Sequence, residues 1–139
     1  MRRRLFFIHS GDRRGVAALE FAMVAPLLIL MMLGMVVYGG WFWMAHSVQS
    51  LASEGARAAI AGLDPAERET LAHGFIGVQV GDLGLRADRA AVEVESTAVL
   101  IRVNVAYDIS DHPLMALAAI MPAPPRIIRR TAVVRIGGY

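Results

Sequence analysis

The stretch RRGVAALEFAMVAPLLILMMLGMVVYGGWFWM, residues 13–44, dominates this chain. Within it begins an uncharged run of 25 residues, 21–45, that contains no Asp, Glu, Lys or Arg. As an α-helix this run rises about 37 Å, more than the roughly 30 Å hydrocarbon core of a bilayer. A helix so long and apolar on every face is typical of a membrane span. We therefore expect residues 16–45 to form a transmembrane helix.

The charges of the chain are distributed unevenly around this run. All 14 basic residues are arginine, and the five in residues 1–15 are Arg2, Arg3, Arg4, Arg13 and Arg14. With Asp12 they give this stretch a net charge of +4, whereas the whole chain carries +2. Arginines beside a membrane segment keep that end of the chain in the cytoplasm. The pattern predicts a cytoplasmic leader over 1–15 and an extracytoplasmic domain over 46–139, and it does not favour a nucleic-acid partner.

The far end of the run carries three consecutive aromatic residues, Trp41, Phe42 and Trp43. Aromatic rings gather at the headgroup level of membranes, so we predict that these three anchor the helix at the interface with membrane lipid. A secretory signal peptide has a shorter apolar core and a cleavage site with small residues. The simplest interpretation is therefore an uncleaved signal anchor.

One carboxylate, Glu20, lies near the start of this segment, five residues after Gly15. An acid costs about 2.5–3.5 kcal/mol at the centre of a membrane, and less near its edge. A cut after Gly15 would leave a free amine on Val16, only about 6–7 Å from Glu20 along the helix axis. In a low dielectric, pairing these charges is favoured over leaving either alone. Alternatively, Glu20 reaches cytoplasmic water beside the neighbouring arginines.

The sequence GVAALEF resembles the processing site of type IV pilin-like proteins, with Gly15 before the cut, Val16 after it, Glu20 fifth and Phe21 sixth. Together with SLASEGARAAIAG further on, it is similar to TadE-like pseudopilins of the tight-adherence (Tad, Flp-pilus) assembly systems, over residues 13–62. The resemblance implies maturation by a prepilin peptidase and docking guided by Glu20. It implies as partners other pilin-like subunits and the pilus assembly platform, at the bacterial inner membrane with a periplasmic C-terminal domain.

The remaining sequence predicts a small α+β domain. The first helix should continue beyond the membrane to Gly62, with Gly55 allowing another element to approach closely. Asp64 and Pro65 should begin a second helix that stops at Gly74. Residues 75–85 could add a short edge strand.

Residues 91–96, 99–109 and 126–136 alternate between apolar and polar side chains, which predicts antiparallel strands with Val99, Ile101 and Val103 on an inner face. Residues 113–121 should form a short apolar helix, packed in the core or on the membrane surface, or else binding a partner. The predicted fold is a long N-terminal helix, its first half transmembrane, packed on a small antiparallel sheet, in the manner of a pseudopilin.

No motif for catalysis stands out. The chain has no cysteine, its four histidines are scattered, and no serine lies in a nucleophile-elbow motif. We therefore expect no enzyme activity, metal or cofactor. The leading hypothesis is a minor pseudopilin-like component for building a Flp-type pilus or its secretion machinery. The alternative is an unprocessed single-span accessory subunit of an unrelated membrane complex.

Overall fold

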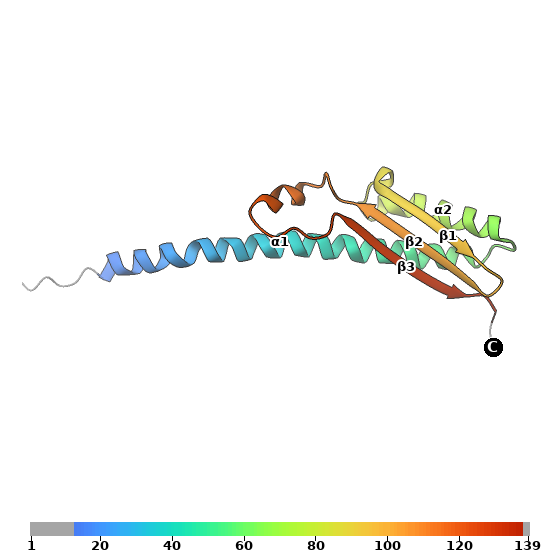
Figure 1. Cartoon of the computed structure of the whole chain (residues 1–139), viewed down its shortest axis with the longest axis horizontal. Coiled ribbons are helices and arrows are strands. Elements are labelled where there is room, and N and C mark those ends of the chain that lie inside the picture. Colours follow the sequence, from blue (N-terminus) through green and yellow to red (C-terminus); the bar gives the residue numbers. More distant parts are fainter. Residues whose placement is uncertain (1–12, 138–139) are drawn as a thin grey trace, which may run out of the picture.

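The computed structural model describes residues 13–137, and its largest element is one long helix, α1 (Arg13–Ala59). Pro26 lies inside α1, where it removes a hydrogen-bond donor, yet the helix continues through it. Figure 1 shows the N-terminal half of α1 extending away from the rest of the molecule, while the C-terminal half lies against a sheet. The molecule is therefore a rod with a small domain built along one half.

The sheet has three antiparallel strands in the order β1-β2-β3: β1 (Ala90–Ser96), β2 (Leu100–Asp108) and β3 (Ile127–Arg135). On β2, every second side chain faces α1 and is buried. These inward residues are Ile101, Val103, Val105 and Tyr107. The predicted α+β layout, with a long apolar helix and a small antiparallel sheet, is confirmed.

The inward position predicted for Val99 is wrong. Its side chain is 65% exposed, because it lies in the turn between β1 and β2 rather than in a strand. The Thr97 hydroxyl accepts hydrogen bonds from the backbone N–H groups of Val99 and Leu100, and this local pattern closes the turn before β2 begins.

The second helix, α2 (Pro65–Asp82), begins as predicted. The Asp64 side chain accepts a hydrogen bond from the Glu67 backbone N–H at 2.8 Å, and the Glu67 carboxylate accepts one from the Leu63 N–H at 2.8 Å. The predicted stop at Gly74 and the edge strand over 75–85 are wrong, because the helix continues to Asp82.

The physical reason for this longer helix is packing. Ala72, Ile76 and Val80 are spaced one turn apart and all three are buried. Extending this stripe across the core outweighs the roughly 1 kcal/mol that each helical glycine costs relative to alanine. The turn after α2 contains Gly84 with a positive φ of 66°, which glycine adopts without strain.

The close contact between α1 and α2 is centred on Gly55. A Cβ atom at this position would lie 2.6 Å from Cδ1 of Ile76, so the contact exists only because Gly55 has no side chain. Ala52, Ala56 and Ala72 are fully buried around it. The predicted close approach at Gly55 is confirmed, and α2 is the element that uses it.

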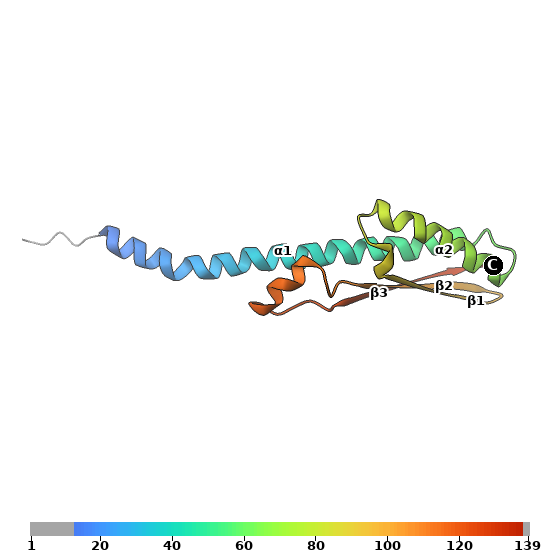
Figure 2. The ribbon, with the colours of Figure 1, turned by 90° about the horizontal axis from the view of Figure 1, so that it is seen from above.

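Two short 3₁₀ helices lie in the connections: η1 (Ala87–Arg89) links α2 to β1, and η2 (Pro113–Ala119) lies between β2 and β3. The short helix predicted over 113–121 is present as η2, and it lies beside α1. In Figures 1 and 2, η2 reaches past the end of the sheet, along α1, toward its N-terminal half.

The helix contact at Gly55 gives a first testable prediction. Gly55→Leu should overpack the contact with Ile76 and lower the free energy of unfolding by about 1–3 kcal/mol. The matched control is Gly74→Ala, on α2 where a Cβ would meet nothing, which should raise this free energy by up to about 1 kcal/mol. Urea unfolding of the full chain in detergent, followed by near-ultraviolet circular dichroism, measures both. Equal stability of wild type and Gly55→Leu would contradict the contact.

Candidate functional site

The residues singled out for processing and pairing occupy the first two turns of α1. Gly15, Val16, Glu20 and Phe21 are all exposed on the part of α1 that extends from the domain. Four residues of helical rise separate Val16 from Glu20, which corresponds to about 6 Å along the axis. No described side chain of the protein forms an ion pair with Glu20.

The predicted topology arginines fall at the edge of what the structure describes. Arg13 and Arg14 are the first two residues of α1. Arg2, Arg3 and Arg4 lie outside the described residues. All five arginines precede the apolar segment in the sequence.

The apolar surface of α1 has a sharp end. From residue 16 to residue 36 no side chain is buried, and the first buried one is Val37, which is 1% exposed. Twenty-one helical residues rise about 31 Å, which matches the roughly 30 Å hydrocarbon core of a bilayer. Within residues 13–137, α1 is the helix long and apolar enough to cross a membrane, as a single span. The domain begins to cover α1 where such a span would end.

The three aromatic residues predicted as interface anchors differ in their surroundings. Phe42 and Trp43 are more than half exposed on the outside of α1. Trp41 is half-buried: its indole Nε1–H donates a hydrogen bond to the Pro125 carbonyl at 3.0 Å. One turn earlier, the Tyr38 hydroxyl donates to the Pro122 carbonyl at 3.1 Å. Two rings at the proposed interface thus also fasten the domain to the helix, a role the sequence did not indicate.

Arg130 also approaches Trp41. Its guanidinium carbon lies 5.9 Å from the centre of the Trp41 ring, within the range of a cation–π contact. Arg130 occupies an inward position of β3, between Ile128 and Ala132, where the alternating pattern calls for an apolar side chain. In the sequence, an arginine at this inward position indicates that a side chain beneath the strand must accommodate its charge; in the structure that side chain is the Trp41 ring.

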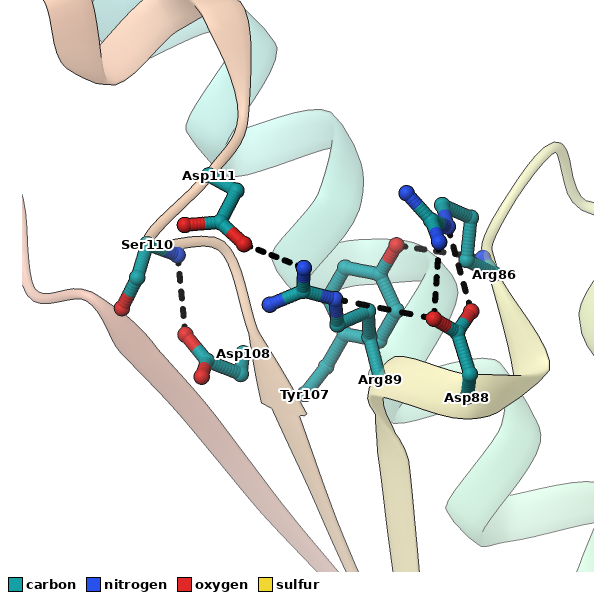
Figure 3. A network of polar contacts seen from close by, with 7 residues as sticks. All are labelled: Arg86, Asp88, Arg89, Tyr107, Asp108, Ser110 and Asp111. Atoms are coloured by element: carbon teal, nitrogen blue, oxygen red, sulfur yellow. Dashed lines mark hydrogen bonds and ion pairs between the residues drawn. The ribbon is translucent and has the colours of Figure 1, made fainter.

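A polar network joins η1 to the end of β2 (Figure 3). Arg86 forms two hydrogen bonds to Asp88, at 3.1 and 2.7 Å, and the Arg89 guanidinium bonds to Asp111. The Tyr107 hydroxyl accepts a hydrogen bond from the Arg86 backbone N–H at 3.1 Å. The network connects the segment before β1 with the segment that leads into η2.

The charges of this network shift its pKa values in the directions expected for ion pairs. The hydrogen bond from Arg86 holds the pKa of Asp88 below its ordinary value. The hydrogen bond to Asp111 raises the pKa of Arg89. The pKa of Asp108 is lowered by hydrogen bonds from Ser110, whose backbone N–H donates at 2.8 Å. Asp88, Arg89 and Asp108 therefore all stay charged near neutral pH.

The hollow beside this network is small, about 110 Å³, and is lined by residues that include Arg86, Arg89 and Tyr107. Among residues 13–137, no group of three or more His, Asp or Glu side chains is arranged to hold a metal ion. The network is best described as a fastening between two loops, and the surface of α1 is the stronger candidate for function.

Comparison with known proteins bears on this surface. Residues 15–57 match the family model described as TadE-like protein. No curated protein and no solved structure matches the chain. The matched residues run from Gly15 through the membrane-length segment to the contact with α2 at Gly55. The predicted resemblance to TadE-like proteins is thus confirmed for residues 15–57, which make up most of α1.

Proposed function

We propose that this protein is a minor pseudopilin-like component for assembly of a Flp-type pilus or of its secretion machinery. In this proposal it crosses the bacterial inner membrane once, with its N-terminus in the cytoplasm and its domain in the periplasm. The observation that carries the proposal is a coincidence of positions. The TadE-like match begins at Gly15, the residue before the proposed cut, and the exposed stretch of bilayer length that follows, residues 16–36, contains a single carboxylate, Glu20.

The first step of the proposed function is cleavage by a prepilin peptidase. Hydrolysis of the peptide bond between Gly15 and Val16 would leave a carboxylate on Gly15 and an amine on Val16. This bond lies in the first turn of α1, which begins at Arg13. Backbone N–H groups of a first turn have no helical partners, so local unwinding there costs little and would expose the bond. Cleavage would also remove the leader, with its net charge of +4.

The second step is pairing of the new amine with Glu20. The two charges would lie within about 6 Å of each other in membrane depth, and an acid within the membrane is unfavourable unless it is paired. The apolar surface around Glu20 has no cover within the described chain. Packing among other pilin-like subunits would cover this surface and bring the amine of one subunit to the carboxylate of the next. The charge pair would then set the position of each subunit on the assembly platform.

One observation favours a second candidate, an unprocessed single-span accessory subunit of another membrane complex. α1 runs without interruption from Arg13 through Gly15, so the helix itself does not mark a boundary at the proposed cut. In that case Glu20 would lie at the cytoplasmic interface beside arginines that stay attached. The two candidates differ in the N-terminal residue of the mature chain, which N-terminal sequencing identifies directly.

Processing is tested by N-terminal sequencing of the protein extracted from membranes of cells with and without the prepilin peptidase. We expect Val16 as the first residue only when the peptidase is present. Gly15→Val should block the cut, because the peptidase would have to accept a branched side chain next to the bond. Gly34→Val, in the same helix where a Cβ would meet nothing, is the control and should be cut normally. A mature wild-type chain that starts at Met1 supports the unprocessed subunit.

Pairing is tested with Glu20→Ala. This variant should insert in the membrane at least as well as wild type, because it removes an acid worth at most about 2.5–3.5 kcal/mol of insertion cost. It should reduce the sheared pilus fraction and the co-purification of other pilin-like subunits. Glu54→Ala is the matched control, since it removes an exposed carboxylate of α1 that pairs only with Arg57 at 3.2 Å. Normal piliation in the Glu20→Ala strain would refute the pairing role.

A further inference from the structure

The segment between β2 and β3 contains an apolar loop, residues 113–125, that is free of charged side chains over 13 residues. It comprises η2 and the proline-rich chain that follows. Ile120 is 57% exposed, and Ala116 and Ala119 are exposed beside it. The buried core of the domain lies between the sheet and the two long helices, and Leu114 and Met115 of the loop pack against it. A free apolar surface of this kind, on an otherwise alternating domain, indicates contact with something other than water.

Three contacts fix this apolar loop against a short stretch of α1. The Tyr38 hydroxyl and the Trp41 indole each donate a hydrogen bond to a proline carbonyl of the loop, as described above. Between them, Leu114 packs on Gly40, where a Cβ atom would lie only 2.5 Å from Cδ1 of the leucine. The loop therefore cannot move along α1 without breaking these contacts, and its level on the helix is set.

That level corresponds to the outer boundary of the membrane. The exposed segment 16–36 has the length of a hydrocarbon core, and the headgroup layer adds roughly 5–7 Å on each side, or about three to five residues of helix. The contacts at Tyr38, Gly40 and Trp41 fall within that layer. Figures 1 and 2 show η2 reaching from there further toward the N-terminal half of α1, that is, toward the bilayer.

Basic side chains follow the apolar loop on the side away from the membrane. Arg126, Arg129 and Arg130 come directly after it, at the start of β3, and the Arg130 guanidinium lies over the Trp41 ring. An apolar tip followed by aromatic rings and then by arginines matches the order of chemistry across a membrane interface, from acyl chains to phosphates. A protein partner would not require this order.

We propose that the apolar loop inserts into the periplasmic face of the same bilayer that α1 spans, with Ile120 and Met121 among the acyl chains and the arginines at the lipid phosphates. The domain would then have two membrane contacts and a fixed orientation. This inference requires that α1 crosses a membrane, but it does not require cleavage or pilus assembly. The inference can therefore fail while the proposed function holds, and the proposed function can fail while the inference holds.

Because the chain contains no cysteine, a single introduced cysteine can be labelled specifically, which permits a direct test. Ile120→Cys, labelled with an environment-sensitive fluorophore, is reconstituted as the full chain in vesicles of phosphatidylethanolamine and phosphatidylglycerol. The matched control is Val99→Cys, an exposed apolar position in the turn at the opposite end of the sheet. Lipids with brominated acyl chains should quench the label at 120 severalfold more than the label at 99. Iodide in the water should show the reverse order.

Each other outcome counts against the proposal. Equal access of iodide to both labels would mean that the loop lies in water. Protection of the label at 120 from both quenchers, increasing with the ratio of protein to lipid, would mean that another protein molecule covers the loop. Should Ile120→Cys fail to fold, Ala119→Cys offers a second exposed position whose substitution removes no large side chain.

The contact at Trp41 provides a second test of the same inference. Trp41→Phe keeps an aromatic ring but removes the hydrogen bond to the Pro125 carbonyl, so the loop loses part of its attachment to α1. We expect iodide quenching of the label at 120 to increase severalfold in this variant. Trp43→Phe, which alters a ring on the outside of α1, should leave it unchanged. No difference between the two variants would show that Trp41 does not hold the loop at the membrane.

Discussion

The structure depends on how the apolar surface of one 47-residue helix is kept from water. Apolar surface in contact with water is unfavourable in proportion to its area, so every part of α1 requires a cover. The second half receives it from α2, the sheet and η2. The first half receives none from the described chain, over a length that matches a bilayer. The cover that the domain provides begins at Val37, the first buried residue of α1.

The two halves of α1 differ in the size of their side chains for the same reason. The membrane half is rich in Leu, Ile and Met, which fit the disordered chains of lipid without close shape matching. The domain half turns toward α2 through Gly55 and several alanines, so that two helix backbones approach closely. One helix thus combines a surface suited to a fluid solvent with a surface suited to a solid core.

The sequence predicted those features that depend on local pattern. The long apolar run, the cap at Asp64, the close approach at Gly55 and the alternation along β2 each follow from residues near one another in the chain. The failures came where distant packing decides. Gly74 predicted the end of the helix, but α2 continues beyond it because Ile76 and Val80 are buried in the core. The second role of Trp41 depends on Pro125, 84 residues away, and no local pattern connects them.

The topology of the domain has a consequence for the order in which it forms. The strand nearest the C-terminus, β3, packs on α1, the first element to be synthesised. A chain that is still being synthesised therefore holds an incomplete sheet, whose β2 has one open edge until the last residues arrive. During that interval the open edge can pair with a neighbouring chain, so aggregation competes with folding. Rapid completion of the chain then favours formation of the native domain.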